Sequence, residues 1–83
     1  MGGRQGVIRN YRDWLPEIPE GAVASLGEGE TPLIEAPRLS ERIGVRLYLK
    51  FEGMNPTASF KDRGMTVALS RAVAAGSRAC ICA

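Results

Sequence analysis

The sequence contains no histidine and only two cysteines, Cys80 and Cys82, among its 83 residues. Without histidine, a Ser-His-Asp or Cys-His catalytic site cannot be built from this chain alone. The Cys-x-Cys pair lacks the two further ligands that a zinc site needs, and in a strand its thiols would point to opposite faces. We therefore expect two small buried hydrophobic residues in a reducing compartment, and no metal site.

Long apolar runs are also missing, because no stretch reaches the roughly 20 residues of a membrane span. Arg4 and Arg9 are not followed by an apolar region, so the N-terminus does not match a secretory signal. The basic residues form no block, and the net charge is only +2, which disfavours a nucleic-acid surface. We expect a cytoplasmic protein that binds neither membrane nor nucleic acid.

What the sequence does contain is consistent with one small globular unit. The apolar fraction is 45%, which is ordinary for a folded protein, although a chain of this length buries only a modest core. Proline, glycine and hydrophobic spacing predict the boundaries of the first elements. In chain order we expect a loose segment over 1–10, a short strand over 23–26, a loop over 27–32, a helix over 37–43 ending at Gly44, a strand over 46–51 and a turn over 53–58.

The last elements indicate the fold class. Residues 46–51 alternate between apolar and polar side chains, which predicts a strand whose Leu47, Leu49 and Phe51 face the core. A helix over 60–75 and an apolar run over 78–83 follow, and the run is typical of a buried strand. The order strand, helix, strand predicts a parallel β-α-β unit of an α/β protein. Because the last strand finds no neighbour in the sequence, we expect this unit to be incomplete.

The helix over 60–75 has its own start and stop signals. Ser59 and Asp62 are spaced as a capping box, and Gly76 suits the C′ position after the last turn. On a helical wheel, Lys61 lies in the middle of the apolar arc. Burial there and the positive end of the helix dipole would both favour the free amine, which is the form that Schiff-base chemistry needs. A lysine in the first turn can instead extend past the helix start and stay charged, so both alternatives remain open.

Two stretches closely resemble the opening of threonine synthases, which are pyridoxal 5'-phosphate (PLP) enzymes of the tryptophan-synthase-β-like fold (fold type II). The first is SLGEGETPL over 25–33, and the second is LYLKFEGMNPTASFKDRGM over 47–65. The family pattern Asn-Pro-Thr-Gly-Ser-Phe-Lys-Asp-Arg-Gly is matched over 55–64, except that Ala58 stands in place of the usual glycine. The resemblance implies that residues 1–83 are the N-terminal segment of a single PLP-dependent catalytic domain.

By this resemblance Lys61 is the catalytic Schiff-base lysine, and Phe60 lies near the cofactor. The implied reaction converts O-phospho-L-homoserine and water to L-threonine and phosphate, a carbon-oxygen lyase step that ends threonine biosynthesis. In the family, the groups that hold the PLP phosphate and ring come after the position of Ala83, so we expect the chain alone to be inactive. Asp62 and Arg63 are expected to cap and pair locally.

Other identities stay open. A threonine dehydratase or a cysteine-synthase relative would share the fold, although the Gly-Glu-Gly-Glu-Thr-Pro-Leu loop favours a threonine synthase. A truncated polypeptide with no activity of its own is a further alternative. Gly29 and Thr31 would line the substrate entrance or simply form a tight turn. The sequence does not determine the oligomeric state, and a homodimer of the parent enzyme is one option.

Overall fold

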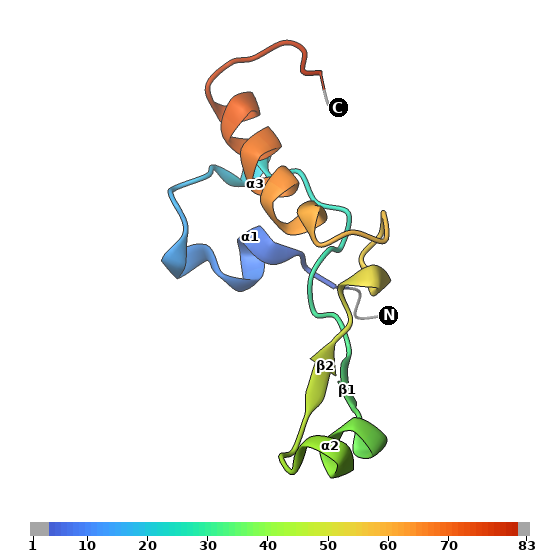
Figure 1. Cartoon of the computed structure of the whole chain (residues 1–83). Helices are drawn as coiled ribbons and strands as arrows, with labels where there is room; N and C mark the ends of the chain where they lie inside the picture. The colour runs from blue at the N-terminus through green and yellow to red at the C-terminus, as the bar shows by residue number, and fades with distance from the viewer. Residues whose placement is uncertain (1–3, 82–83) are drawn as a thin grey trace.

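The computed structural model describes residues 4–81. The chain is elongated, with principal extents of 52 × 28 × 26 Å. A helical part lies at one end, and an arm made of a small sheet and a short helix projects from it (Figure 1). The helices and strands are, in chain order, α1 (Val7–Asn10), β1 (Leu33–Glu35), α2 (Pro37–Ile43), β2 (Tyr48–Lys50) and α3 (Lys61–Ala74). Short 3-10 turns span Arg12–Trp14, Glu20–Ala22 and Glu52–Met54.

The core is small and lies where α1 and the Glu20–Ala22 turn pack against α3. Ile8, Ile18 and Ala22 form its buried cluster. Residues 7–10, which we expected to be loose, therefore form a helix that buries two side chains, Val7 and Ile8. The adjacent pair of large apolar residues outweighs the Gly-rich composition around it, because burying each such side chain contributes about 1.5–3 kcal/mol.

Helix α2 has the predicted bounds and the predicted end. Pro37 is its first residue, and Gly44 adopts the left-handed conformation at φ 76° that glycine tolerates at a helix C-terminus. The hydroxyl of Ser40 accepts the Leu47 N–H at 2.8 Å. This bond fastens α2 to the chain that enters β2.

The sheet is two-stranded and antiparallel, with Leu33 opposite Lys50 and Glu35 opposite Tyr48. The predicted strand over 46–51 is present in shorter form as β2, whereas β1 was missed because prolines 32 and 37 closely bracket its three residues. No parallel β-α-β unit occurs within residues 4–81, since the short α2 turns the chain straight back. The expected buried face is also wrong: Leu49 and Phe51 are about half exposed, because no second layer covers the sheet in the described residues.

Two further strand predictions fail. Residues 23–26 form no strand; the Ala24 N–H donates instead to the hydroxyl of Ser70 at 2.7 Å. Residues 78–81 also lack regular structure, Cys80 is exposed and Ile81 is 99% exposed. A strand needs a neighbour to pair with, and within residues 4–81 none lies beside this segment. Cys82 and the end of the predicted strand, residues 82–83, lie outside the described residues.

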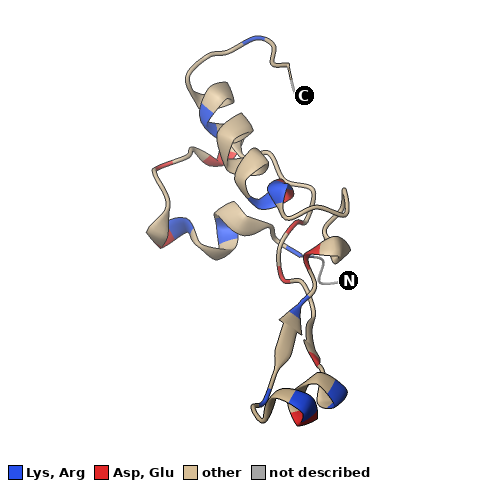
Figure 2. Cartoon of the chain, viewed as in Figure 1, with Lys and Arg blue, Asp and Glu red and all other residues tan. Residues whose placement is uncertain are grey.

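Helix α3 matches its prediction to within one residue at each end. Gly76, at φ 89°, donates to the Val73 carbonyl at 3.0 Å, and Ser77 donates to the Ala72 carbonyl at 3.0 Å. This pair of bonds is the Schellman motif, with Gly76 at C′ as predicted. None of the helices within residues 4–81 has the length and apolar character needed to cross a bilayer. Lys and Arg residues are spread from the arm to α3 and alternate with acidic residues (Figure 2).

Candidate active site

The turn before α3 is held by side chains that follow it. The Asp62 carboxylate accepts hydrogen bonds from the Thr57 N–H, at 2.8 Å, and from the Thr57 hydroxyl. The Ser59 hydroxyl accepts the Lys61 N–H at 3.1 Å, so Ser59 serves the helix start. The capping box is not formed, because Asp62 reaches back to Thr57 rather than to Ser59. Ala58, inside this turn, has φ 61°, the left-handed conformation that favours glycine.

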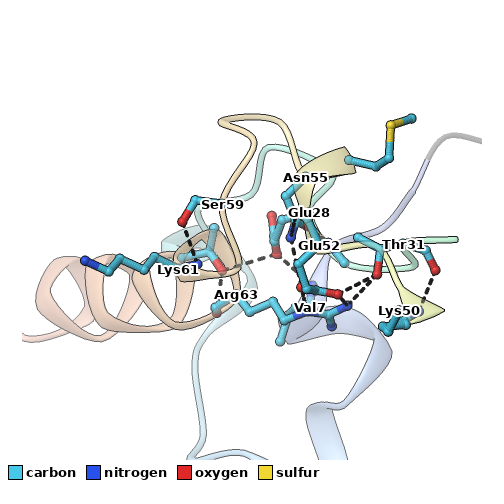
Figure 3. Close-up of polar contacts among 12 residues, drawn as sticks. Val7, Glu28, Thr31, Lys50, Glu52, Asn55, Ser59, Lys61 and Arg63 are labelled. Atoms are coloured by element: carbon cyan, nitrogen blue, oxygen red, sulfur yellow. Dashed lines mark hydrogen bonds and ion pairs between the residues drawn. The ribbon is translucent and has the colours of Figure 1, made fainter. Parts of the chain in front are cut away.

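Lys61 is the first residue of α3, and its side chain is exposed. Figure 3 shows its amine pointing away from the polar cluster on the other side of the helix. The buried residues of α3 are instead Asp62, Thr66 and Ser70. The wheel selected the wrong face, because this helix packs through small polar side chains that bond to loops. Of the two alternatives for Lys61, burial on the packed face of the helix is not observed, because the side chain is exposed.

A pocket of about 850 Å³ lies beside Lys61. One wall comes from the extended segment 23–26 and the other from the turn before α3 and its first two turns. Phe60 does not line this pocket. It lines a second one, of about 430 Å³, which Lys61 also borders. The residues from the helix side of the larger pocket are Thr57, Ser59, Lys61, Asp62, Met65, Thr66 and Leu69.

The chemistry of this lining fits part of PLP. Lys61 provides the primary amine that an aldehyde requires, and Met65 and Leu69 provide an apolar surface for a flat ring. The hydroxyls of Ser25 and Thr57 can bond polar ring substituents. Among the described lining residues Lys61 is the one cation, so this wall offers a phosphate group no second positive charge.

Glu28 joins the two walls of the pocket. Its side chain is fully buried, and its carboxylate accepts the Val7 N–H at 2.7 Å, the Leu26 N–H at 2.9 Å and the hydroxyls of Ser25 and Thr66. Burial alone would raise the pKa of Glu28, but these donors outweigh it and hold the pKa below its usual value. Glu28 is therefore a charged tie between α1, the loop and α3.

Glu52 and Arg63 form a second tie, beside the first. The Arg63 Nε and Nη2 atoms lie 2.6 and 3.0 Å from the two carboxylate oxygens of Glu52. The Thr31 hydroxyl donates to Glu52 at 2.6 Å and accepts from Arg63 at 3.2 Å. The Asn55 amide donates to Glu52 at 2.9 Å and accepts the Gly29 N–H at 2.8 Å. Hydrogen bonds from Arg63 and then Thr31 lower the pKa of Glu52 to about 2.

These ties include residues for which sequence analysis predicted no role. Glu28 and Glu52 were unassigned, and the available signal was an acidic residue between two glycines and another directly after a strand. Asp62 and Arg63 were expected to pair locally, and they do so with Thr57 and Glu52. Gly29 and Thr31 both belong to the ties, which supports the tight-turn interpretation of that loop. No group of three or more potential metal ligands occurs within residues 4–81.

Comparison with known proteins places this site in a family context. The model of the family described as pyridoxal-phosphate dependent enzyme matches residues 24–83. The chain is 58% identical over 78 residues to the threonine synthase of Mycobacterium leprae, covering 94% of the chain and 22% of that protein. It is 53% identical over 81 residues to the threonine synthase of Synechocystis sp., covering 95% and 21%, and 49% identical over 83 residues to that of Halalkalibacterium halodurans, covering 100% and 23%. The chain thus spans about a fifth of the length of these curated relatives.

Proposed function

The chain belongs to the family of pyridoxal-phosphate dependent enzymes, and we propose that it is the N-terminal segment of a threonine synthase. The whole enzyme would convert O-phospho-L-homoserine and water to L-threonine and phosphate. The observation that carries this proposal is the amine of Lys61 at the edge of an 850 Å³ pocket, within a family motif that departs at Ala58 alone. The identities of 49–58% to three threonine synthases support the choice among family members.

In this proposal Lys61, Met65 and Leu69 have distinct roles in the pocket. Bound PLP supplies an electron sink for charge that develops on the substrate. Lys61 holds the cofactor, and its Nζ carries protons to and from the substrate carbons. Met65 and Leu69 exclude water from one wall. Glu52 is unsuited to act as a base, because its pKa of about 2 keeps it ionised and weakly basic near neutral pH.

Further parts of the proposal concern the longer protein. Phe60 packs at the start of α3 beside the cofactor lysine, which its shared pocket with Lys61 supports. In the longer protein, residues 78–81 would join a parallel sheet once further strands lie beside them. The 83 residues alone would not catalyse the reaction, because the described part of the pocket wall offers the cofactor phosphate no cation besides Lys61. The proposal also includes a cytoplasmic location and a homodimeric assembly for the full-length enzyme.

The Lys61→Ala substitution in the full-length enzyme tests the function. Loss of the amine should reduce formation of threonine and phosphate from O-phosphohomoserine by about a thousandfold or more. Lys50→Arg is the control, because it changes the other lysine of the chain and should leave turnover within about twofold. Undiminished turnover in the Lys61→Ala enzyme would contradict the assignment. An unchanged enzyme that deaminates threonine but does not form it would favour the dehydratase alternative.

A further inference from the structure

The side chains of three consecutive residues at the start of α3 extend in three different directions. Lys61 extends toward the pocket, Asp62 turns back to Thr57, and Arg63 crosses to Glu52 and Thr31 (Figure 3). The backbone of Lys61 is therefore followed immediately by two anchored residues. The direction in which its amine leaves the helix depends on how firmly these anchors hold the first turn.

The anchor at Arg63 is the more extensive of the two. Each oxygen of the Glu52 carboxylate receives two hydrogen bonds, one from Arg63 and one from Asn55 or Thr31. A carboxylate has about four acceptor positions, so Glu52 is fully satisfied. The forked pairing also fixes the orientation of both planar groups, which a single contact would not do. The pKa of Arg63 is raised by its bonds to Glu52, so both partners stay ionised near neutral pH.

The loop over 27–32 packs closely against Arg63, and little room is left for a side chain at Gly29. Gly29 adopts φ 84°, and a Cβ added there would lie 3.2 Å from the Val7 side chain and 3.4 Å from the Arg63 guanidinium. A side chain at position 29 would therefore press against the guanidinium that binds Glu52. Movement of the loop would be transmitted directly to the first turn of α3.

The same loop continues backward into the wall of the pocket that faces Lys61. Residues 23–26 line that wall, and Glu28 and Thr31 follow them in the chain. Three bridges join this stretch to α3: Ala24 to Ser70 at 2.7 Å, Glu28 to Thr66 at 3.2 Å, and Thr31 to Arg63 at 3.2 Å. The bridges lie about one helical turn apart, so together they determine both the spacing and the rotation of the two walls.

We propose that Arg63 is a positioning residue that, through Glu52 and Thr31, sets the direction in which Lys61 faces the opposite wall of the pocket. This inference rests on the proposed function, because it assigns Lys61 to the cofactor. Arg63 itself does not line the 850 Å³ pocket. Its effect is preorganisation of the amine, which limits the orientations that a bound ring can take.

The chain offers an internal reference for the test, since Lys61 and Lys50 are its two lysines. The 83-residue chain is incubated with PLP, reduced with borohydride, digested, and the labelled peptides are quantified by mass spectrometry. The circular dichroism of the bound cofactor, in its own absorption band, reports whether the ring is held in one orientation. Far-ultraviolet circular dichroism monitors helix content.

In the unchanged chain, Lys61 should be labelled in preference to Lys50. Arg63→Gln removes the forked pair with Glu52 and the bond to Thr31. It should lower the labelling rate at Lys61 by about fivefold and should remove the cofactor dichroism. Arg71→Gln is the matched control, because it removes the same charge from the same helix and its guanidinium reaches only the Glu17 carbonyl. That variant should behave like the unchanged chain.

Thr31→Val provides a second variant, because it removes one hydroxyl and keeps the ion pair. It should lower the labelling of Lys61 by about twofold. If Arg63→Gln loses helix content, Thr31→Val alone tests whether the network positions Lys61. Preferential labelling of Lys61 that persists with full cofactor dichroism in the variants overturns the positioning role and leaves the proposed function standing. Absence of preferential labelling in the unchanged chain also overturns the positioning role, whereas the proposed function is overturned by undiminished turnover of the full-length Lys61→Ala enzyme.

Discussion

At position 58 the residue type does not suit the backbone conformation. Its alanine has φ 61°, and the left-handed region costs a residue with a Cβ roughly 1–2 kcal/mol. The turn nevertheless keeps this shape, because the Asp62 carboxylate binds Thr57 on one side and the Ser59 hydroxyl binds the Lys61 N–H on the other. The one departure from the family motif therefore falls where glycine is sterically favoured.

Replacing this alanine should stabilise the chain. Ala58→Gly relieves the strain at φ 61°, partly offset by the greater entropy of glycine in the unfolded state, for a net gain of about 0.5–1 kcal/mol. Ala68→Gly is the matched control, since it makes the same change inside α3 and should destabilise by about 1 kcal/mol. Urea unfolding of the three chains measures both effects. A decrease in stability for Ala58→Gly would show that the turn is not strained.

At the scale of elements, α2, α3 and β2 could be predicted from sequence, whereas α1, β1 and the antiparallel pairing of the sheet could not. Proline at the start of α2, and Gly44 and Gly76 after α2 and α3, determine these helix ends through local backbone geometry. Strands depend on partners, so an alternating or apolar run predicts a strand only when a neighbour is present. This dependence explains the misjudged segments 23–26 and 78–81 and the missed strand β1.

The candidate site also contains some features that sequence could predict and others that it could not. Lys61 was identified through a motif, which is local. The face that α3 buries was misjudged, because Thr66 and Ser70 are buried by hydrogen bonds to loops distant in sequence. The ties through Glu28 and Glu52 were also invisible, since a charged residue in a loop is usually exposed and only the fold reveals its donors.

The ion pair between Glu52, in the turn after β2, and Arg63 of α3 predicts how stability depends on pH. The pKa of Glu52 is about 2 in the folded chain, against an ordinary value of 4.5. The unfolded state thus binds the proton more tightly, so this contribution is complete above pH 4.5 and is lost as the pH falls toward 2. The urea midpoint should fall over this window, and Glu52→Gln should flatten that part of the decline. A Glu52→Gln chain with the same acid profile as the parent would contradict the role of this carboxylate.

At the scale of the whole molecule, order is distributed unevenly. The buried cluster around Ile8 lies in the helical part, whereas the arm of β1, α2 and β2 carries large apolar side chains that are about half exposed. The arm therefore lacks the burial that stabilises most elements. The chain as a whole should unfold with a stability below the roughly 5–15 kcal/mol of typical domains.

Hydrogen exchange should resolve this difference within one molecule. Amides of β1 and β2 should exchange much faster than those of the middle of α3, because their bonds open without disturbing the core. Measurement of residue-specific exchange by nuclear magnetic resonance in the 83-residue chain provides the test. Equal protection in the arm and in α3 would mean that the arm is stabilised by contacts other than those described.

The arm also has a consequence for handling the protein. Within residues 4–81 each strand of the sheet has a single neighbour, so both outer edges present free backbone donors and acceptors. Lys50 and Glu35 are the only charges in these two strands, which is little protection against pairing with another copy. Concentrated solutions should therefore form β-rich aggregates by edge-to-edge stacking, visible as light scattering that rises steeply with concentration. A charge placed at Leu49, as in Leu49→Lys, should suppress the scattering, and unchanged scattering would show that association begins elsewhere.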